Sequence, residues 1–222
     1  MTSFLEEIEQ SFPAGLVLPD EFRRLFVWME TNGFVHKYDR SDRRYASLYP
    51  GELNRAKGGS LVAFHASDVC PAFVEAITLN NDPKTIAHVA SRLAIFIRTG
   101  GDGSLAGIWK NDEGKQVFVH IGSGSGSVML CTLADNPVDM LRLFAIGYYE
   151  LCWPEEFADP PADDYDHGAC LPPAQFRDWV ESNFGVTIPA TASEIITRTA
   201  EYGDENSHDP FTRWISNYSM ED

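Results

Sequence analysis

The sequence predicts a chain of mixed helices and strands, in which a meander of strands near the middle is flanked by helices on both sides. Two turn sequences support the meander. Thr99-Gly-Gly-Asp-Gly and Asn111-Asp-Glu-Gly each stand between runs of β-branched, aromatic and other apolar residues. Before residue 33 and after residue 172, apolar residues recur at three- and four-residue spacing, which is typical of amphipathic helices.

Two helices are expected at the N-terminal end. Ser3 followed by Glu6 is a capping-box pattern, so a short helix is predicted over 3–11. A second helix begins near Pro19, and Asn32-Gly33 ends it. Its apolar face is formed by Phe22, Leu25, Phe26 and Met29.

The middle of the chain holds the predicted strands. Residues 60–65 and 74–79 are each interpreted as a strand or a buried helix, and Asp82-Pro83 opens a short helix. Four strands follow, and then a strongly apolar helix over 138–149. The strands are expected at 93–98, 104–110, 116–121 and 128–133.

The last third differs from the rest in composition. Residues 154–173 are acidic and rich in proline, so a linker or long loop is predicted there. Helices are expected at 173–184, 191–202 and 208–218, and the last of these carries Phe211, Trp214 and Ile215 to dock on the protein. We therefore expect a domain at 1–153 and an acidic helical extension at 154–222, docked on that domain.

The charge excludes several classes of partner. The formal net charge is −16, and residues 154–222 carry 3 basic and 15 acidic side chains, a net of −12. Proteins that bind nucleic acid gain most of their affinity from Lys and Arg against phosphate. The negative net charge therefore predicts that the protein does not bind nucleic acid or an anionic membrane, and it favours a basic protein partner.

The compartment is predicted from what the sequence lacks. Residues 1–10 have no basic and apolar segments of a secretory signal, and no run approaches the roughly 18 apolar residues that span a bilayer. The four cysteines are scattered, without a CxxC pair. We expect reduced, mostly buried thiols in a cytoplasmic protein. They are Cys70, Cys131, Cys152 and Cys170.

No motif indicates catalysis, a metal or a cofactor. The Gly/Ser run 122–127 lacks the last glycine of a dinucleotide-binding loop and the lysine of a phosphate-binding loop. It also lacks the pattern Gly-x-Ser-x-Gly of a nucleophile elbow, because Gly and Ser alternate in it. A flexible strand connection is therefore predicted. The cluster Asp163, Asp164, Asp166 and His167 lacks the spacing of a calcium loop and is interpreted as a solvated acidic loop. The six histidines stand singly, and His120 is expected on a sheet face.

A basic cluster lies within residues 40–57, which are predicted to form a loop. Arg40, Arg43 and Arg44 beside Tyr45 resemble a nucleic-acid patch, but the overall charge opposes phosphate binding. The favoured interpretation is a solvated loop that pairs with the acidic last third.

The order of elements resembles the SUKH superfamily, which includes bacterial immunity proteins and a yeast cell-wall synthesis regulator. Leu18-Pro19-Asp20-Glu21-Phe22 through Asn32-Gly33 is similar to the family's opening helix, and the turn Gly100, Gly101, Asp102, Gly103 is similar to its central turn. The likeness covers about residues 4–150, with a long insertion at 34–92. It implies an α+β fold with a central, mostly antiparallel sheet flanked by helices, and it brings no catalytic residues.

The leading hypothesis is a non-enzymatic immunity protein that binds and neutralises a cognate toxin domain. That partner is expected to be basic, with a nuclease as one candidate, and the protein is expected to be a monomer or weak dimer. The predicted contact residues are Glu155, Glu156, Asp159, Asp163, Asp164 and Asp166. One alternative is a small hydrolase or transferase with a pocket near Gly100–Gly103 that uses Asp102 and a histidine from a facing strand. Another is a regulatory scaffold, and whether 34–92 joins the interface stays open.

Overall fold

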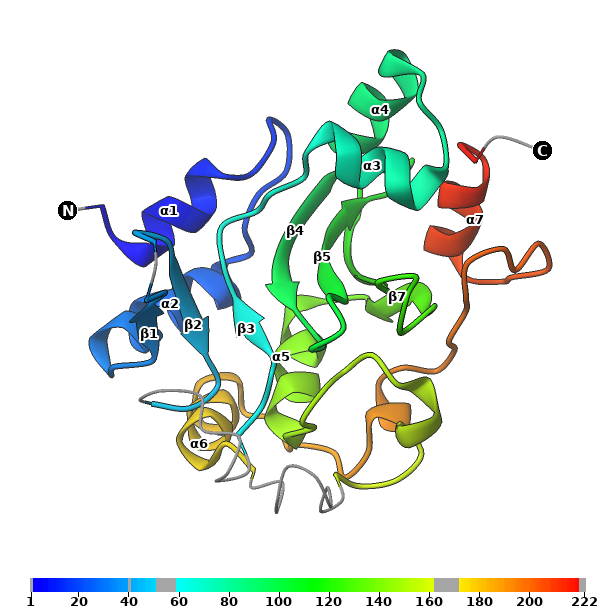
Figure 1. The fold of residues 1–222 in the computed structure, drawn as a ribbon. Helices are drawn as coiled ribbons and strands as arrows, with labels where there is room; N and C mark the ends of the chain where they lie inside the picture. Colours follow the sequence, from blue (N-terminus) through cyan, green and yellow to red (C-terminus); the bar gives the residue numbers. More distant parts are fainter. Residues whose placement is uncertain (1, 40, 51–58, 162–171, 220–222) are drawn as a thin grey trace.

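A computed structural model describes residues 2–39, 41–50, 59–161 and 172–219 of the chain. Its centre is a seven-stranded sheet whose strands follow one another in sequence order, and every neighbouring pair is antiparallel. Helices pack on both faces of this sheet (Figure 1). The α+β fold with a central antiparallel sheet is thus confirmed.

The sheet is a meander. Its strands are β1 (Val35–Lys37), β2 (Arg44–Ser47), β3 (Ala63–Phe64), β4 (Leu93–Arg98), β5 (Leu105–Lys110), β6 (Gln116–Ile121) and β7 (Leu130–Ala134). The predicted turns at 99–103 and 111–114 connect β4 to β5 and β5 to β6. The central strands are buried on both faces, because successive side chains of a strand point to opposite sides and both sides carry helices.

The first face of the sheet carries four helices. They are α1 (Phe4–Gln10), α2 (Asp20–Thr31), α5 (Pro137–Ile146) and α6 (Ala174–Phe184). The predicted capping box of Ser3 and Glu6 is present at α1, and the predicted apolar face of α2 is fully buried. Phenylalanine rings form much of this core: Phe22 stacks on Phe118 and meets Phe64 and Phe96 edge-on. Such geometry adds to the burial of the rings.

The second face carries α3 (Pro71–Thr78), α4 (Pro83–Ala90) and α7 (Pro210–Ser216). Trp109 of β5 lies between Phe211 and Trp214 of α7, with ring centroids at 5.4 and 5.2 Å. The prediction that the last helix docks is confirmed, since Phe211, Trp214 and Ile215 are all buried. Two 3-10 turns, η2 (Pro154–Glu156) and η3 (Ala192–Glu194), complete the described elements.

The prediction of a helix over 191–202 is wrong. Only η3 is helical there, and the following residues run beside the sheet. Ala200 accepts a hydrogen bond from the Leu130 amide at 2.7 Å, and the Tyr202 amide donates to Val128 at 3.0 Å. The edge of β7 offers backbone partners that a separate helix would leave unused, so tertiary pairing overrides the local pattern.

Other sequence assignments shift at their boundaries. Part of the expected loop at 40–57 forms β2, which pairs with β1 and β3, while residues 51–58 lie outside the described part. Residues 74–78 belong to helix α3, Leu79 follows it in a left-handed conformation, and only Ala63 and Phe64 of 60–65 form a strand. Helix α5 ends at Ile146, because Gly147 adopts a left-handed conformation with φ +99°.

The acidic last third contributes to both cores. Phe157, Phe176, Trp179 and Val180 join the core of the first face, and α7 joins that of the second. Within the described ranges, no helix has the length and apolar character needed to cross a bilayer.

Candidate functional site

The Gly100–Gly103 turn is organised around the carboxylate of Asp102. Its Oδ1 accepts a hydrogen bond from the Ser104 amide at 2.9 Å. Its Oδ2 accepts from the Ser104 and Ser123 hydroxyls and from the Ser127 amide, each at 2.8 Å. Asp102 therefore caps its own turn and also holds the loop that follows β6.

The Gly/Ser loop at 122–127 closes directly on this carboxylate. A Cβ at Gly126 would lie 2.7 Å from the Cβ of Asp102, and a Cβ at Gly100 would lie 2.6 Å from both Asp102 Oδ1 and Cys152 Sγ. Only glycine permits such approaches. The loop was predicted to be a flexible connection, whereas its contacts with Asp102 give it a defined geometry.

The hydrogen bonds set the ionisation of Asp102. Burial by itself would raise the pKa of this carboxyl group, but the amide and hydroxyl donors of Ser127, Ser104 and Ser123 outweigh burial and lower the pKa below its ordinary 3.8. The donors favour the charged form because each of them binds a carboxylate oxygen. Asp102 is thus an ionised structural centre at neutral pH.

His120 is the histidine of the facing strand, and it does not bond to Asp102. Its Nε2 and the Thr99 hydroxyl are 3.0 Å apart, and its Nδ1 and the Met129 carbonyl oxygen are 3.0 Å apart. The carbonyl can only accept, so Nδ1 carries the proton and Nε2 accepts from Thr99. Complete burial lowers the pKa of His120 to about 4. Both groups that the hydrolase or transferase hypothesis needs are therefore occupied by other contacts.

Glu150 is a neighbour of this turn that the sequence did not reveal. Its Oε1 accepts from the Gly101 amide, and its Oε2 accepts from the Trp153 indole N–H, both at 2.6 Å. The residue follows α5, so nothing in the local sequence connects it with the turn at 100–103. It fixes the chain where the acidic last third begins.

The predicted contact residues lie partly within the described chain. Glu155, Glu156 and Asp159 are exposed on and just after η2. Asp163, Asp164 and Asp166 lie outside the described residues. Hydrogen bonds hold η2 beside η3. The Ser193 amide donates to the Phe157 carbonyl at 2.9 Å, and the Tyr148 hydroxyl bonds to both segments.

Tyr148 lies near acidic residues of both turns. Its hydroxyl donates to the Asp159 carbonyl at 2.6 Å and accepts from the Ala192 amide at 3.0 Å. Burial raises the pKa of Tyr148, the Ala192 amide opposes this, and the negative charges of Glu156, Asp159 and Glu194 raise the pKa further. We call Glu155, Glu156, Asp159 and Glu194 the acidic patch. Glu194 was missed because the sequence placed it inside a helix.

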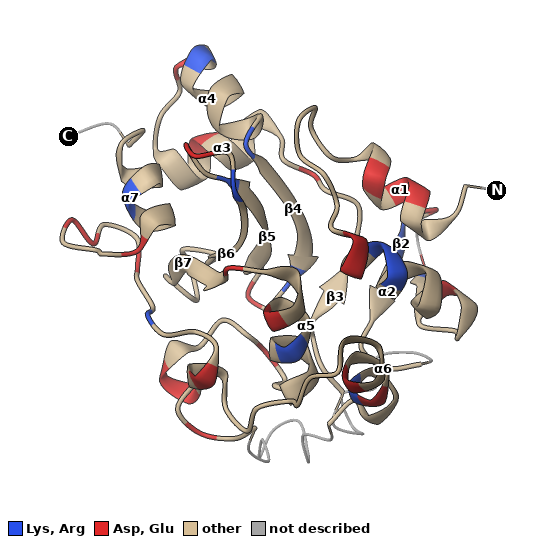
Figure 2. Cartoon of the chain, turned by 180° about the vertical axis from the view of Figure 1, so that it is seen from behind, with Lys and Arg blue, Asp and Glu red and all other residues tan. Residues whose placement is uncertain are grey.

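Charge compensation differs sharply between the two parts of the chain. The described residues form nine ion pairs with one another, and every one uses a carboxylate between Glu7 and Asp139. Within the same residues, Glu155 and Asp159 have no basic partner. Figure 2 shows the red segments of η2 and η3 at the end of the molecule opposite α3 and α4. Glu155 and Asp159 of the acidic patch are thus exposed without a basic partner in the described part of the chain.

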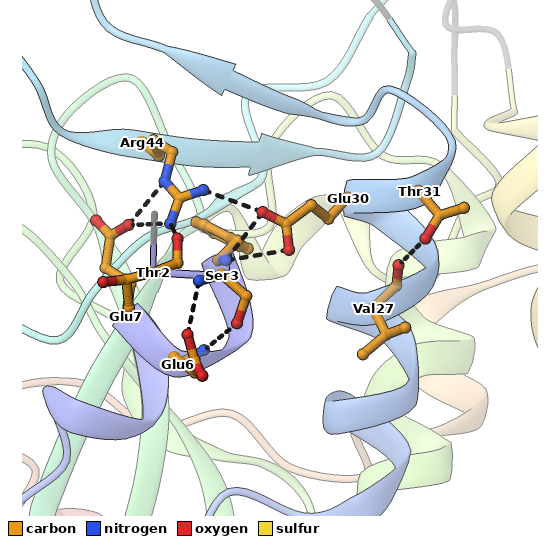
Figure 3. Close-up of polar contacts among 9 residues, drawn as sticks. Thr2, Ser3, Glu6, Glu7, Val27, Glu30, Thr31 and Arg44 are labelled. Atoms are coloured by element: carbon orange, nitrogen blue, oxygen red, sulfur yellow. Dashed lines mark hydrogen bonds and ion pairs between the residues drawn. The ribbon is translucent and has the colours of Figure 1, made fainter.

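The basic cluster has a structural role beside the N-terminal helices. Figure 3 shows the Arg44 guanidinium between α1 and α2. It contacts the Glu7 carboxylate at 2.8 Å through both Nε and Nη2, and Glu30 at 3.0 Å. It also donates to the Thr2 carbonyl, while Glu30 accepts from the Phe4 amide. Arg44 joins β2 to both N-terminal helices.

For Arg43 and Arg44, the expectation that they pair with the last third is therefore wrong. Arg43 lies 3.8 Å from Asp68, and Arg44 is bound to Glu7 and Glu30. Arg40 lies outside the described residues. The acidic groups of α1 and α2 are nearer in space because β2 packs beside them.

In the described ranges, no three His, Cys, Asp or Glu side chains are placed so that they could hold a metal ion. Cys131 and Cys152 are buried free thiols, and Cys70 is free but exposed. Burial is the main cause that raises the pKa of Cys131 to about 12, with Asp209 adding to it. Cys170 lies outside the described part.

Comparisons with known proteins add no relative. No protein-family model matches the chain. Neither the curated proteins nor the solved structures gave a significant match.

Proposed function

We propose that this chain is a non-enzymatic binding protein that neutralises a basic partner, as an immunity protein neutralises its cognate toxin domain. The observation that carries the proposal is the uneven charge compensation. Nine carboxylates before residue 140 have arginine or lysine partners, whereas Glu155 and Asp159 of the acidic patch have none among the described residues.

Uncompensated charges create a field that extends beyond the surface. At physiological ionic strength this field is felt over about 8 Å, and it steers a complementary partner during the encounter. A basic toxin domain, such as one that acts on nucleic acid, offers the complementary charge. The exposed carboxylates would then take positions that phosphate groups take in the toxin's own substrate.

The backbone that carries the acidic patch is also held in place before a partner binds. Its carboxylates lie on two short turns that are held together by the Ser193–Phe157 bond and by Tyr148. Preorganised charges lose little conformational freedom when a partner binds. The buried Phe157 and Ala192 anchor the same turns in the core.

The test titrates the protein with the product of a neighbouring toxin-like gene in a calorimeter. The patch variant Glu155→Gln, Asp159→Asn, Glu194→Gln should weaken binding by about tenfold, since three surface charges contribute roughly 0.5 kcal/mol each. The matched control Asp20→Asn, Glu75→Gln, Glu113→Gln removes the same charge from other exposed positions and should bind like the wild type.

Salt provides the second arm of the test. Affinity should fall as sodium chloride rises from 0.05 to about 0.3 M, and the fall should be smaller for the patch variant. Absence of binding, or equal weakening in the patch and control variants, would contradict the proposal.

A further inference from the structure

The edge of β7 ends in a small polar cavity that the proposed function does not use. The chain after η3 pairs with this edge at Val128–Leu130, through the bonds of Ala200 and Tyr202. Continuing that register would bring Arg198 opposite Thr132. Instead the Thr132 amide donates to Asp209 Oδ2 at 2.9 Å. The side chain of Asp209 thus ends the pairing, and the two segments separate.

The separation leaves a cavity of about 240 Å³. It is lined by Thr132, Asp135, Thr197, Arg198, His208 and Asp209, among others. Liquid water occupies about 30 Å³ per molecule, so the space holds roughly eight waters. That volume is below the range of drug-sized ligand pockets and suits a small polar group.

The two carboxylates of the cavity are already engaged. Asp209 Oδ1 accepts from the Phe211 amide, the Thr212 amide and the Thr212 hydroxyl, and its Oδ2 accepts from Thr132. Asp135 lies 3.5 Å from Lys115. Neutral donors therefore satisfy the oxygens of Asp209, and Lys115 compensates the charge of Asp135.

The side-chain hydrogen-bond donors that line the cavity, unlike its carboxylates, have no partner within the described part of the chain. The Thr132 hydroxyl is buried and has no hydrogen-bond partner among the described residues. Thr197, Arg198 and His208 are exposed at the rim of the cavity. Among the described residues Arg198 makes no ion pair, and the His208 ring and the Thr197 hydroxyl make no hydrogen bond. A guanidinium offers five N–H donors and accepts nothing, so this side of the cavity calls for an acceptor.

We propose that this cavity binds a small oxyanion, a phosphate or a carboxylate group, with Arg198 as its main ligand. Arg198 matches the planar geometry of either group through two parallel N–H donors. The hydroxyls of Thr132 and Thr197 and an imidazole N–H of His208 supply further donors. The site goes beyond the proposed function and does not depend on it, because the acidic patch lies on η2 and η3.

The test is an NMR titration of the labelled protein with sodium phosphate and, separately, with sodium acetate at constant ionic strength. We expect saturable shifts at Thr132, Arg198 and His208 with one or both anions, and the tighter anion identifies the preferred group. Arg198→Ala should weaken binding at least tenfold. Arg213→Ala is the matched control, since Arg213 is exposed on α7 and does not line the cavity.

A second variant separates binding from folding. Thr132→Val keeps the shape of the side chain but removes the buried hydroxyl, so it should weaken anion binding several-fold without lowering the thermal midpoint. The proposal is overturned if neither anion gives saturable shifts up to 20 mM, or if Arg198→Ala and Arg213→Ala bind alike.

Discussion

Asp102, which is partly buried, and His120, which is fully buried, show how polar residues can serve the fold. Asp102 collects four donors from three serines, and His120 bonds through both ring nitrogens. A buried polar group with all its partners in place specifies one arrangement of its neighbours. Both residues have chemically versatile side chains, and their contacts connect β4, β6 and β7.

Replacing Asp102 by Asn should destabilise the protein at neutral pH. The amide oxygen still accepts, but the amide nitrogen would face donors, so we expect a loss of about 2 kcal/mol in the free energy of unfolding. The folded-state pKa of Asp102 is below 3.8. The stabilisation is therefore present above the unfolded value and disappears as the pH falls through the folded one. Urea unfolding at pH 7 and at several pH values below 3.8 should show a difference between the two proteins that is largest at pH 7 and shrinks as the pH falls.

His120 also makes the stability depend on pH, but here the folded state favours the neutral form of the side chain. The unfolded histidine titrates near 6.5, whereas the buried one titrates at about 4. Between these values only the unfolded chain takes up the proton, so stability is highest above pH 6.5 and falls by about 3 kcal/mol as the pH is lowered to 4. His120→Asn, which can still donate to the Met129 carbonyl, should lose much less over this range. Equal losses in urea titrations of both proteins would refute this role of His120.

Helices α1 and α2 and strand β2 illustrate how elements are joined. Arg44 is the shared partner of Glu7 and Glu30, and its guanidinium also lies over the Phe4 ring at 5.7 Å. It is about one quarter exposed, so its ion pairs are less screened than surface pairs. The residue therefore fixes α1, which has only seven residues and would be marginal alone.

Arg44→Ala should destabilise the protein by about 2 kcal/mol and raise amide hydrogen exchange in α1, because two carboxylates lose a common partner. Arg43→Ala serves as the control. Its contact with Asp68 is long and exposed, so its removal should change stability by less than about 0.5 kcal/mol. Exchange mass spectrometry over residues 4–10 and chemical unfolding measure the two effects. Similar behaviour of both variants would show that the contacts in Figure 3 do not hold α1.

At the scale of the whole molecule, the last third completes the two cores. Its aromatic residues lie on both faces of the sheet, with Trp179 stacked on Trp28 at 5.4 Å and Trp214 packed on Trp109 at 5.2 Å. A single buried Trp removed from a core costs about 3 to 5 kcal/mol, which is a large part of the stability of an ordinary domain. The acidic third is thus a part of the packing as well as a source of charge.

A chain that ends at Trp153 should therefore fail to unfold cooperatively. It would lose Phe157, Phe176, Trp179 and Val180 from one core and α7 from the other. Urea unfolding and the dispersion of amide resonances test this expectation. A well-dispersed spectrum with a cooperative transition would show that residues 1–153 fold alone.

Salt should stabilise the intact protein. Most of the excess negative charge lies after Trp153, and Glu155 and Asp159 have no basic partner among the described residues. Screening weakens the repulsion among such groups. The thermal midpoint should rise between 0.02 and about 0.5 M sodium chloride, and a falling midpoint would indicate that attractive pairs dominate.

The sequence by itself determined the elements whose signals are local. The capping box of Ser3, the apolar face of α2, the turns at 99–103 and 111–114 and the docking of α7 follow from neighbours within a few residues of each other. Tertiary structure alone decided the contacts between distant segments: Asp102 with the Gly/Ser loop, Arg44 with Glu7 and Glu30, Glu194 beside Asp159, and residues 200–202 against β7. The reason is that a residue's local pattern specifies its backbone and its buried face. Which charge or hydrogen-bond partner it meets depends on how the strands and helices pack.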